Sequence, residues 1–280
     1  MSTTSRRTVL TALAATAVSG PLLTGIGAAP AHAADDLYAS NTDLYTKLAG
    51  REGTDFARRY KRHEKADAGI TAAYPFHRTT VMAPHGGGIE TGTSELCLGI
   101  AGYHPATLTP RTADAPLYDY WMFEGLRSID NGELHVTATH CDDRVALSMA
   151  GGSLNVLTLH GCKADQAGAP AQRPEAVVVG GRNDTFKRHL ISEFTAAGFQ
   201  TIDGAALRDL AGVDPQNIAN RTVLGMGGQL EITTELRRSM FGTFTRPGRP
   251  VSTNEVFDRF VAAARSAVAR LEAEAGQIIL

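Results

Sequence analysis

The sequence has few cysteines and no excess of charge of either sign. Among its 280 residues are three cysteines, Cys97, Cys141 and Cys162, and their spacing forms neither a CxxC pair nor a zinc knuckle. The formal net charge of −2 argues against a general nucleic-acid-binding protein, because such proteins usually carry a basic surplus. No internal repeat or low-complexity tract is apparent, so a pure interaction scaffold is not favoured.

Two common catalytic motifs are also missing. The sequence has no G-x-x-x-x-G-K-[ST] phosphate-binding loop. The stretch "HGGG" at 85–88 could form the oxyanion hole of an esterase, but that enzyme class needs a G-x-S-x-G nucleophile elbow. The nearest match, "GGSLN" at 151–155, lacks the second glycine and precedes a predicted strand. A serine esterase is therefore disfavoured.

The remaining composition is that of an ordinary globular protein, 43% hydrophobic and 20% charged. The first residues have a basic start, an apolar middle and the exit "AHA", which predicts an export signal over 1–33, cleaved after Ala33. Arg6–Arg7 before the apolar run resembles a twin-arginine signal. Pro21 and nearby glycines disfavour a membrane-anchoring helix. We therefore predict a secreted protein without a membrane anchor after processing, folded as a single catalytic domain over 34–280.

Strands and helices are expected to alternate along this domain. Runs rich in β-branched and aromatic residues, bounded by turn formers, predict strands over 78–85, 119–125, 133–140, 154–161, 175–181, 199–203 and 227–233. Helical periodicity predicts helices over 93–101, 142–150 and 183–198, and a last helix with a capping box formed by Ser252 and Glu255. A short helix starting at Asn41 or Thr42 is also expected. The pattern indicates an α/β fold, a three-layer α/β/α sandwich with a mixed, mostly parallel central sheet.

Histidines stand at the ends of three predicted strands. His85, His140 and His160 end such strands, and Glu231 lies in the last one. In open α/β sheets ligands bind beyond the carboxyl ends of the strands, so we expect these side chains to gather there. A single histidine at a strand end is more often a structural residue, but three of them indicate a functional site.

This set of residues suits a mononuclear zinc hydrolase. Catalytic zinc uses three protein ligands, commonly two histidines and a glutamate. We predict His85 and Glu90 as the near pair and His160 as the distant third ligand, with the intervening glycines letting the loop fold Glu90 back toward His85. Other divalent ions could also bind these ligands.

Glu231 is the expected general base. It stands among apolar residues in "QLEIT", and a carboxylate inside a strand is costly unless it faces a cavity or a cation. In a zinc hydrolase such a group takes the proton of the attacking water and passes it to the leaving amine. The alternative is a residue on the solvated face of an edge strand.

The motifs "APHGGGIETGTSE", "LHVTATHCDD", "LTLHGC", "VVVGGRND", "NIANR" and "GGQLEITTELRRSMF" together resemble the poly-γ-glutamate hydrolase family over about residues 52–245. The resemblance implies a zinc carboxypeptidase-like fold and one zinc ion held by a His, a Glu and a second His, which fall on His85, Glu90 and His160. It places the general base on Glu231. It also implies a substrate with γ-glutamyl amide bonds, although an export signal departs from the bacteriophage members of the family.

An anionic polyamide or peptide substrate needs cationic anchors. We expect Arg182, Asn220 and Arg221 to bind it, since arginine pairs with carboxylates through two parallel hydrogen bonds. His140 and Asp142 could line the site or orient a ligand, in a segment where family members often have an aromatic residue and "DEP". The cysteines are expected to be buried, with Cys141 and Cys162 as a disulfide worth checking. A monomer is expected.

Two alternatives stay open at this stage. The same fold and metal could act on another amide, such as a cell-wall peptide or an N-acyl amino acid. A non-catalytic protein that binds anionic polymers would keep the arginines but need not bind zinc. Metal content separates this last possibility from both enzymes.

Overall fold

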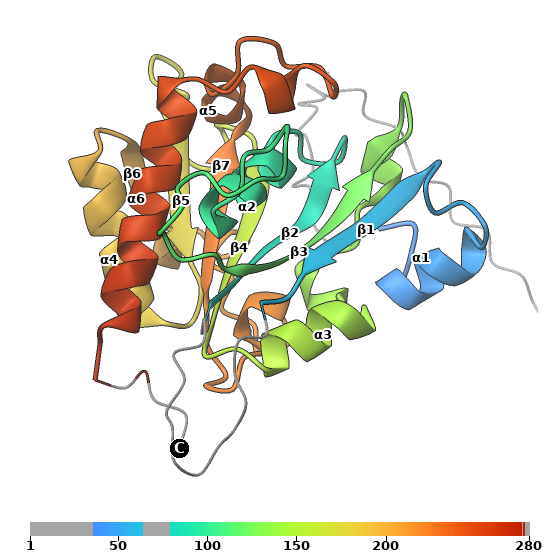
Figure 1. Cartoon of the computed structure of the whole chain (residues 1–280), viewed down its shortest axis with the longest axis horizontal. Helices are drawn as coiled ribbons and strands as arrows, with labels where there is room; N and C mark the ends of the chain where they lie inside the picture. The colour runs from blue at the N-terminus through green and yellow to red at the C-terminus, as the bar shows by residue number, and fades with distance from the viewer. Residues whose placement is uncertain (1–35, 64–78, 276, 278–280) are drawn as a thin grey trace, which may run out of the picture. The chain divides into compact units, whose positions relative to one another are not determined.

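A seven-stranded mixed sheet forms the centre of the fold (Figure 1). The computed structural model describes residues 36–63, 79–275 and 277, all within the compact unit Ala31–Leu280. The predicted export segment 1–33 lies outside the described residues. No helix in the described ranges is long and apolar enough to cross a membrane.

The strands follow the spatial order β1-β3-β2-β4-β7-β5-β6. Their bounds are β1 Phe56–Lys61, β2 Thr79–Gly87, β3 Asp119–Gly125, β4 Asn155–Cys162, β5 Ala176–Gly180, β6 Gln200–Asp203 and β7 Gly228–Thr233. The pairs β1–β3 and β5–β7 are antiparallel, and the other four pairs are parallel. The predicted mixed, mostly parallel sheet is therefore confirmed. Strand β1 was not predicted, because its exposed half carries arginine, tyrosine and lysine in place of apolar residues.

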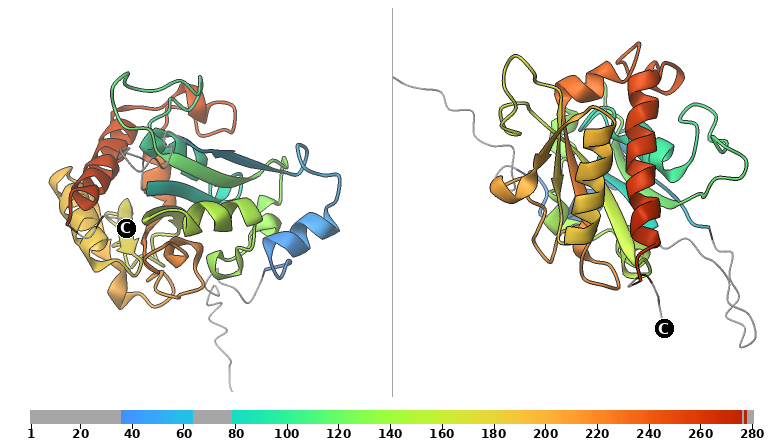
Figure 2. Two further views of the ribbon diagram at one scale, coloured as in Figure 1. Left: turned by 60° about the horizontal axis from the view of Figure 1, so that its bottom comes forward. Right: turned by 90° about the vertical axis from the view of Figure 1, so that its left-hand side faces the viewer.

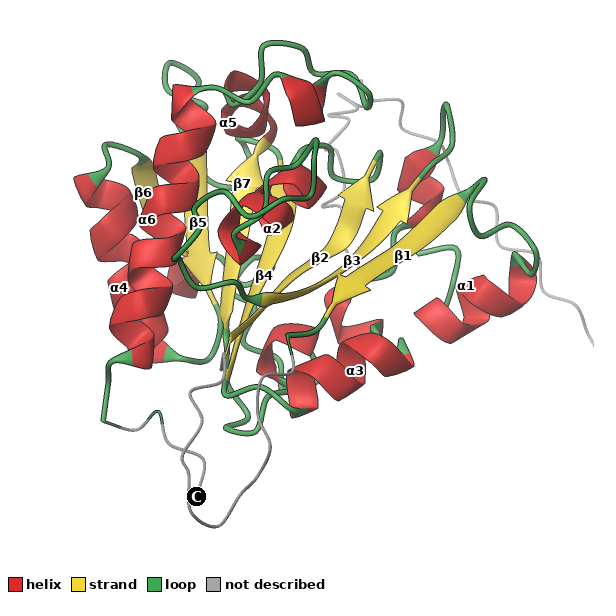
Figure 3. Ribbon diagram, in the orientation of Figure 1, coloured by secondary structure: helices red, strands yellow, loops and turns green. Residues whose placement is uncertain are grey.

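Helices cover both faces of the sheet (Figures 1 and 3). The helices are α1 Asn41–Lys47, α2 Thr93–Ala101, α3 Arg144–Gly151, α4 Asp184–Ala196, α5 Thr234–Ser239 and α6 Glu255–Glu272. Short 3₁₀ helices lie at Asn131–Leu134, Ala138–His140, Gly204–Ala206, Ile218–Asn220 and Arg249–Val251. The two further views in Figure 2 show α4 and α6 side by side against one face, with α3 on the other.

Alternate strand residues contribute to separate hydrophobic cores on the two faces of the sheet. Val81, Leu157 and Leu230 belong to the core under α2, α4 and α6, whereas Met82 and Val156 belong to the core under α1 and α3. Burying one such side chain contributes about 1.5–3 kcal/mol, so each face holds its layer of helices through many such contacts. The strands are apolar on both faces because helices cover both, as the sequence predicts.

Three local predictions are wrong. Residues 133–140 form no strand: two 3₁₀ helices, Asn131–Leu134 and Ala138–His140, flank an extended link instead. The last helix is capped by Asn254, whose side chain accepts hydrogen bonds from Val256 N and Phe257 N, and not by a box at Ser252. Cys141 and Cys162 form no disulfide; all three cysteines are free and buried, as small apolar residues are.

Candidate metal and catalytic site

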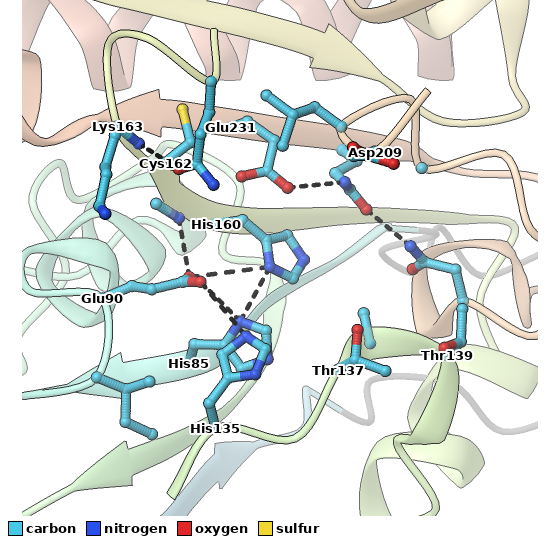
Figure 4. A pocket seen from close by; sticks show the side chains of 18 of the residues that line it. His85, Glu90, His135, Thr137, Thr139, His160, Cys162, Lys163, Asp209 and Glu231 are labelled. Atoms are coloured by element: carbon cyan, nitrogen blue, oxygen red, sulfur yellow. Dashed lines mark hydrogen bonds and ion pairs between the residues drawn. The ribbon is translucent and has the colours of Figure 1, made fainter. Parts of the chain in front are cut away.

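A cavity of about 800 Å³ opens beyond the carboxyl ends of β2, β4 and β7. Its lining includes His85, Glu90, His160 and Glu231, so the residues predicted as metal ligands and general base meet there. It also includes His135, which is not among the residues predicted from the sequence. Figure 4 shows the three histidine rings and the Glu90 carboxylate pointing toward one another.

A bulge in β2 turns His85 toward this cavity. Ala83 pairs with Met122 and Gly86 with Glu124, so β2 has one residue more than β3 between these two pairs. An extra residue reverses the side-chain alternation and re-aims the side chains after it. His85 thereby leaves the face of Val81 and Ala83, where it would have been buried in the apolar core.

The glycines after His85 allow a tight return of the chain. Gly87 has a φ of +66°, and a Cβ there would lie 2.4 Å from the carbonyl oxygen of Gly125. Only glycine meets both conditions without strain. The turn closes with a hydrogen bond from Glu90 N to the carbonyl oxygen of His85 at 2.8 Å. The Glu90 carboxylate consequently returns to the His85 ring, as the sequence predicts.

Three of the predicted residues form one cluster. His85 Nδ1 lies 3.0 Å from Glu90 Oε1 and 3.1 Å from His160 Nδ1. His160 Nδ1 is 3.8 Å from Glu90 Oε2, which also accepts a hydrogen bond from Gly161 N at 2.8 Å. His85 and His160 are almost fully buried.

His135 joins this cluster from the link between the two 3₁₀ helices. Its Nε2 lies 3.8 Å from Glu90 Oε1, and its ring centroid is 3.9 Å from that of His85. His85, Glu90 and His135 each offer a ligand atom within 4.8 Å of the others. The signal for His135 in the sequence is a histidine between two apolar residues, Leu134 and Val136. A strand over 133–140 would instead place His140 at the carboxyl end of the sheet.

The nitrogen and oxygen atoms that converge in this cluster are suited to bind a cation. His85 Nε2 lies 2.8 Å from the carbonyl oxygen of Val136, which can only accept, so this nitrogen carries the proton. In the neutral ring Nδ1 then presents a lone pair to a carboxylate oxygen and to a second imidazole nitrogen. Such convergence of electron-rich atoms in a buried place requires an added proton or a cation between them. Imidazole and carboxylate together suit Zn²⁺ and related divalent ions.

The protonation of the cluster is set by its burial and charges. Burial alone would raise the pKa of Glu90, but the charge and hydrogen bond of His85, with the charges of His160 and His135, lower it to about 2. Burial opposes the charge on His85, yet Glu90 raises its pKa overall. Burial lowers the pKa of His160 to about 3, and Glu90 offsets this only in part. Without a metal, the added proton therefore resides on His85.

Glu231 lies beside this cluster on β7, where it pairs in register with His160 of β4. Gln229 Nε2 donates to Glu231 Oε1 at 3.0 Å, and Asn217 Nδ2 donates to Gln229 Oε1 at 2.8 Å. The backbone N–H of Ala219 donates to Asn217 Oδ1, which fixes the orientation of both amides. Burial and the charge of Glu90 raise the pKa of Glu231 well above its ordinary value, against the lowering effect of Arg237.

Arg237 is a buried cation in the cavity wall. It lies on α5, and its guanidinium donates to the carbonyl oxygens of Ile232 and Thr91 at 3.0 and 2.7 Å and to Thr234 Oγ1 at 3.1 Å. With three of its five N–H donors bound to protein oxygens, it is held in place and acts on the cavity as a fixed positive charge.

The residues predicted to bind substrate lie elsewhere. Arg182, Asn220 and Arg221 are not part of the cavity lining. Asn220 is buried and holds the backbone through Gly212, Asp214 and Gly227, while Arg182 and Arg221 are exposed. The cations at the cavity are Arg237 and the exposed Lys163 and Arg208.

His140 and Asp142 also lie outside the cavity lining. His140 is exposed, and Asp142 Oδ1 accepts a hydrogen bond from Thr42 N at 2.8 Å. Another acidic residue, Asp36, instead contacts a histidine of the cluster. Its Oδ1 lies 2.7 Å from His135 Nδ1, and its Oδ2 accepts from Thr137 N at 2.7 Å. Burial would raise the pKa of Asp36, but these hydrogen bonds lower it overall.

Comparison with known proteins identifies the family of the chain. A family model described as poly-gamma-glutamate hydrolase matches residues 54–263. The chain belongs to this family. The UPF0714 protein YndL of Bacillus subtilis (strain 168) is 34% identical over 197 residues, which cover 70% of this chain and 69% of YndL. The SPbeta prophage-derived YoqZ protein of the same strain is 37% identical over 185 residues, 66% of this chain and 60% of YoqZ.

Two solved structures of family members share the fold. The zinc-free apo form of YndL superposes with a TM-score of 0.68 at 29% identity, covering 85% of this chain and 99% of YndL. A bacteriophage poly-gamma-glutamate hydrolase superposes with a TM-score of 0.67 at 25% identity, covering 84% of this chain and 98% of the phage protein. The resemblance carried by the motifs is thereby confirmed at the level of family and fold.

Proposed function

We propose that this protein is a secreted, metal-dependent hydrolase that cleaves γ-glutamyl amide bonds of poly-γ-glutamate. The convergence of His85, Glu90 and His160, joined by His135, in the cavity wall carries the proposal. The similarity to a bacteriophage poly-gamma-glutamate hydrolase supports the substrate, and the similarity to YndL, which has been solved in a zinc-free apo form, supports the metal. The predicted signal over 1–33 implies export before action.

His85, Glu90 and His160 would hold one zinc ion, with His135 as a further nitrogen donor. When bound, such an ion supplies Lewis acidity to a substrate carbonyl and makes water nucleophilic near neutral pH. His85 and His160 are buried, Glu90 and His135 are half-buried, and the side chains that would hold the ion are already oriented. Val136 fixes the His85 ring and Gly161 N fixes one oxygen of Glu90.

Glu231 would move the proton. Because Gln229 donates to Oε1, the other oxygen, Oε2, is the one left to receive a proton from the attacking water. A carboxylate with a raised pKa is a stronger base and can hold the proton until the leaving nitrogen takes it. The C–O bond to the acyl carbon forms, the C–N bond breaks, and the amine departs with that proton. The buried charge of Arg237 favours negative charge on the acyl oxygen.

Substrate carboxylates would meet Lys163 and Arg208 at the cavity. These two cations are exposed, so their charges are available to a polymer that carries one carboxylate per residue. They replace Arg182, Asn220 and Arg221 as the proposed anchors because they line the cavity.

The test is release of new amino groups from poly-γ-glutamate by the mature protein, starting at Ala34, with and without a chelator. We expect chelator-sensitive cleavage. His85→Ala should lose both metal and activity, and Glu231→Gln should keep the metal and lose activity by about 10²- to 10⁴-fold. His140→Ala and Glu175→Gln, both outside the cavity lining, serve as matched controls.

Other outcomes separate the alternatives. A protein that holds one zinc ion but leaves the polymer intact would refute the substrate and direct the search to cell-wall peptides and N-acyl amino acids. A purified protein that takes up no divalent ion would refute the metal-dependent mechanism. Such a protein that still bound the polymer would be a binding module.

A further inference from the structure

Asp36 contacts the side of His135 that faces away from Glu90. Asp36 Oδ1 lies 2.7 Å from His135 Nδ1, while His135 Nε2 lies 3.8 Å from Glu90 Oε1. The side chain of Asp36 is only 8% exposed, although the residue stands close to the predicted end of the export signal. The histidine is therefore held between a buried carboxylate on one side and the cluster on the other.

The two oxygens of Asp36 have different partners. Oδ2 accepts a hydrogen bond from the backbone N–H of Thr137 at 2.7 Å, which fixes the carboxylate relative to the link that carries His135. Oδ1 is left for the ring. An ionised carboxylate only accepts hydrogen bonds, so His135 Nδ1 carries the proton in this contact. In the neutral ring, Nε2 then presents its lone pair toward Glu90.

This is the arrangement that metal-binding histidines use. Their outer nitrogen usually donates to a carboxylate or carbonyl oxygen, which fixes both the tautomer and the ring orientation. His85 obeys the same rule through the carbonyl oxygen of Val136 at 2.8 Å. His160, by contrast, has a buried Nε2 without a hydrogen-bond partner among the described residues.

The beginning of the mature chain is attached to the same region at further points. Thr42 N donates to Asp142 Oδ1 at 2.8 Å, and the hydroxyl of Tyr45 donates to Asp143 Oδ2 at 2.9 Å. Several contacts thus hold the segment around α1 against residues 135–143, and the contact made by Asp36 is the one that reaches the histidine cluster.

We infer that Asp36 is a positioning residue that holds His135 in the tautomer and orientation in which Nε2 binds the cation of the site. This rests on the proposed function, in that it assumes a divalent ion between His85 and Glu90. It assigns to the start of the mature chain a direct part in metal affinity. It also explains why His135, on a link with little regular structure, has a defined ring orientation.

The test is the zinc dissociation constant of the mature protein, measured by competition with a chromophoric chelator. Asp36→Asn keeps the shape but offers only one oxygen to two N–H donors, so zinc should bind about 10- to 100-fold more weakly. The matched control is Asp119→Asn, because Asp119 Oδ1 contacts His63 Nδ1 at 2.8 Å in the same way but outside the cavity lining. Its zinc affinity should stay within about twofold of the parent.

A double-mutant cycle distinguishes positioning from a general structural role. If Asp36 acts through His135, then Asp36→Asn should add less than about threefold in a His135→Gln background. Equal losses in both backgrounds, or no loss in either, would overturn the inference while leaving the metal site intact. A parent protein that binds no zinc would overturn the metal site itself, and this inference with it.

A measurement on the unmodified protein covers the case in which Asp36→Asn does not fold. The ¹⁵N chemical shifts of the His135 ring report which nitrogen carries the proton. We expect the proton on Nδ1 in the zinc-loaded protein, with Nε2 bound. A ring protonated at Nε2 would overturn the inference without any substitution.

Discussion

The Nδ1 atoms of His85 and His160 lie 3.1 Å apart, although the two residues are separated by 75 positions in the chain. They come from neighbouring parallel strands, β2 and β4, whose carboxyl ends meet at one edge of the sheet. Because His85 Nε2 donates to Val136, these nitrogens face each other with at most one proton between them. That contact makes the cluster sensitive to both metal and pH.

Removal of the metal should make the stability of the protein depend on pH through His160. Burial lowers the pKa of His160 in the folded protein to about 3 from an ordinary value of 6.5. Below pH 6.5 this histidine therefore binds a proton in the unfolded chain but not in the folded chain. The contribution of His160 to the free energy of unfolding should therefore fall as the pH falls, by up to about 1.4 kcal/mol per pH unit.

Between pH 6.5 and 4.5 this effect meets an opposite one from Glu231, because its raised pKa leaves the folded chain with a proton that the unfolded chain lacks. The raised pKa of His85 acts above 6.5, and the lowered pKa of Glu90 acts below 4.5. Urea unfolding in the presence of a chelator measures the slope in the parent and in His160→Gln, and the difference between the two slopes gives the contribution of His160. The same slope in both proteins would show that another group is responsible.

The hydrogen bond from Gln229 should affect the pKa and position of Glu231 without affecting metal binding. Gln229→Met removes the donor to Glu231 Oε1 in a buried place, and hydrogen bonds to charged groups contribute about 1.5–3 kcal/mol. We expect kcat to fall about 10- to 100-fold with zinc content unchanged. Since the lost donor favoured the ionised carboxylate, the acidic limb of the kcat/KM profile should move to higher pH.

Gln216→Met is the control for this experiment, because Gln216 is exposed and accepts a hydrogen bond from Arg221 outside the cavity lining. It should leave kcat and the pH profile as they are. If Gln229→Met has only the effect of this control, Gln229 does not position the general base.

A larger residue at position 161 should destabilise the protein, because the guanidinium of Arg237 packs directly against Gly161. A Cβ at Gly161 would lie 2.5 Å from Arg237 Cζ, and Arg237 has little freedom with three protein partners. Gly161→Ala should lower the free energy of unfolding by about 1–3 kcal/mol. In Gly151→Ala the nearest atom is 3.9 Å away at the end of α3, so stability should be unchanged or slightly higher. Urea denaturation compares the two, and an equal response would disprove the role of the close approach.

The polymer should be held by the cavity cations. Lys163→Ala and Arg208→Ala should each raise KM for poly-γ-glutamate by up to about fivefold, since an exposed charge pair is worth up to about 1 kcal/mol. kcat should change little, and the effect should shrink at high salt.

Arg182→Ala and Arg221→Ala provide the comparison, because both cations are exposed but lie outside the cavity lining. Steady-state kinetics over a range of salt concentrations decides between the two pairs. A larger effect of the second pair would restore the anchors that the sequence alone suggests.

Much of the fold could be predicted from the sequence. Six of the seven strands and the helices α2, α3, α4 and α6 lie where apolar periodicity and turn residues predict them. The exceptions have local causes. Residues 133–140 have the composition of a strand but form two 3₁₀ helices and an extended link. Strand β1 shows little apolar pattern because one end of it is exposed to solvent.

The individual chemical groups of the site were also visible in the sequence. Histidines at strand ends, a glycine run that permits a tight return and a lone glutamate in an apolar strand are local features, and each obeys a local rule of backbone geometry or burial. These rules brought His85, Glu90, His160 and Glu231 to one place.

The further residues of the site come together through long-range contacts. His135 and its partner Asp36 are 99 positions apart, and no local rule connects them. Arg237 enters the cavity wall because Gly161 leaves room for it, which depends on the packing of α5 against β4. Arg182 and Arg221 lie outside the lining because loop direction, unlike strand periodicity, is set by long-range contacts. Local features of the sequence predict the chemical groups of the site, and long-range packing sets which further side chains lie beside them.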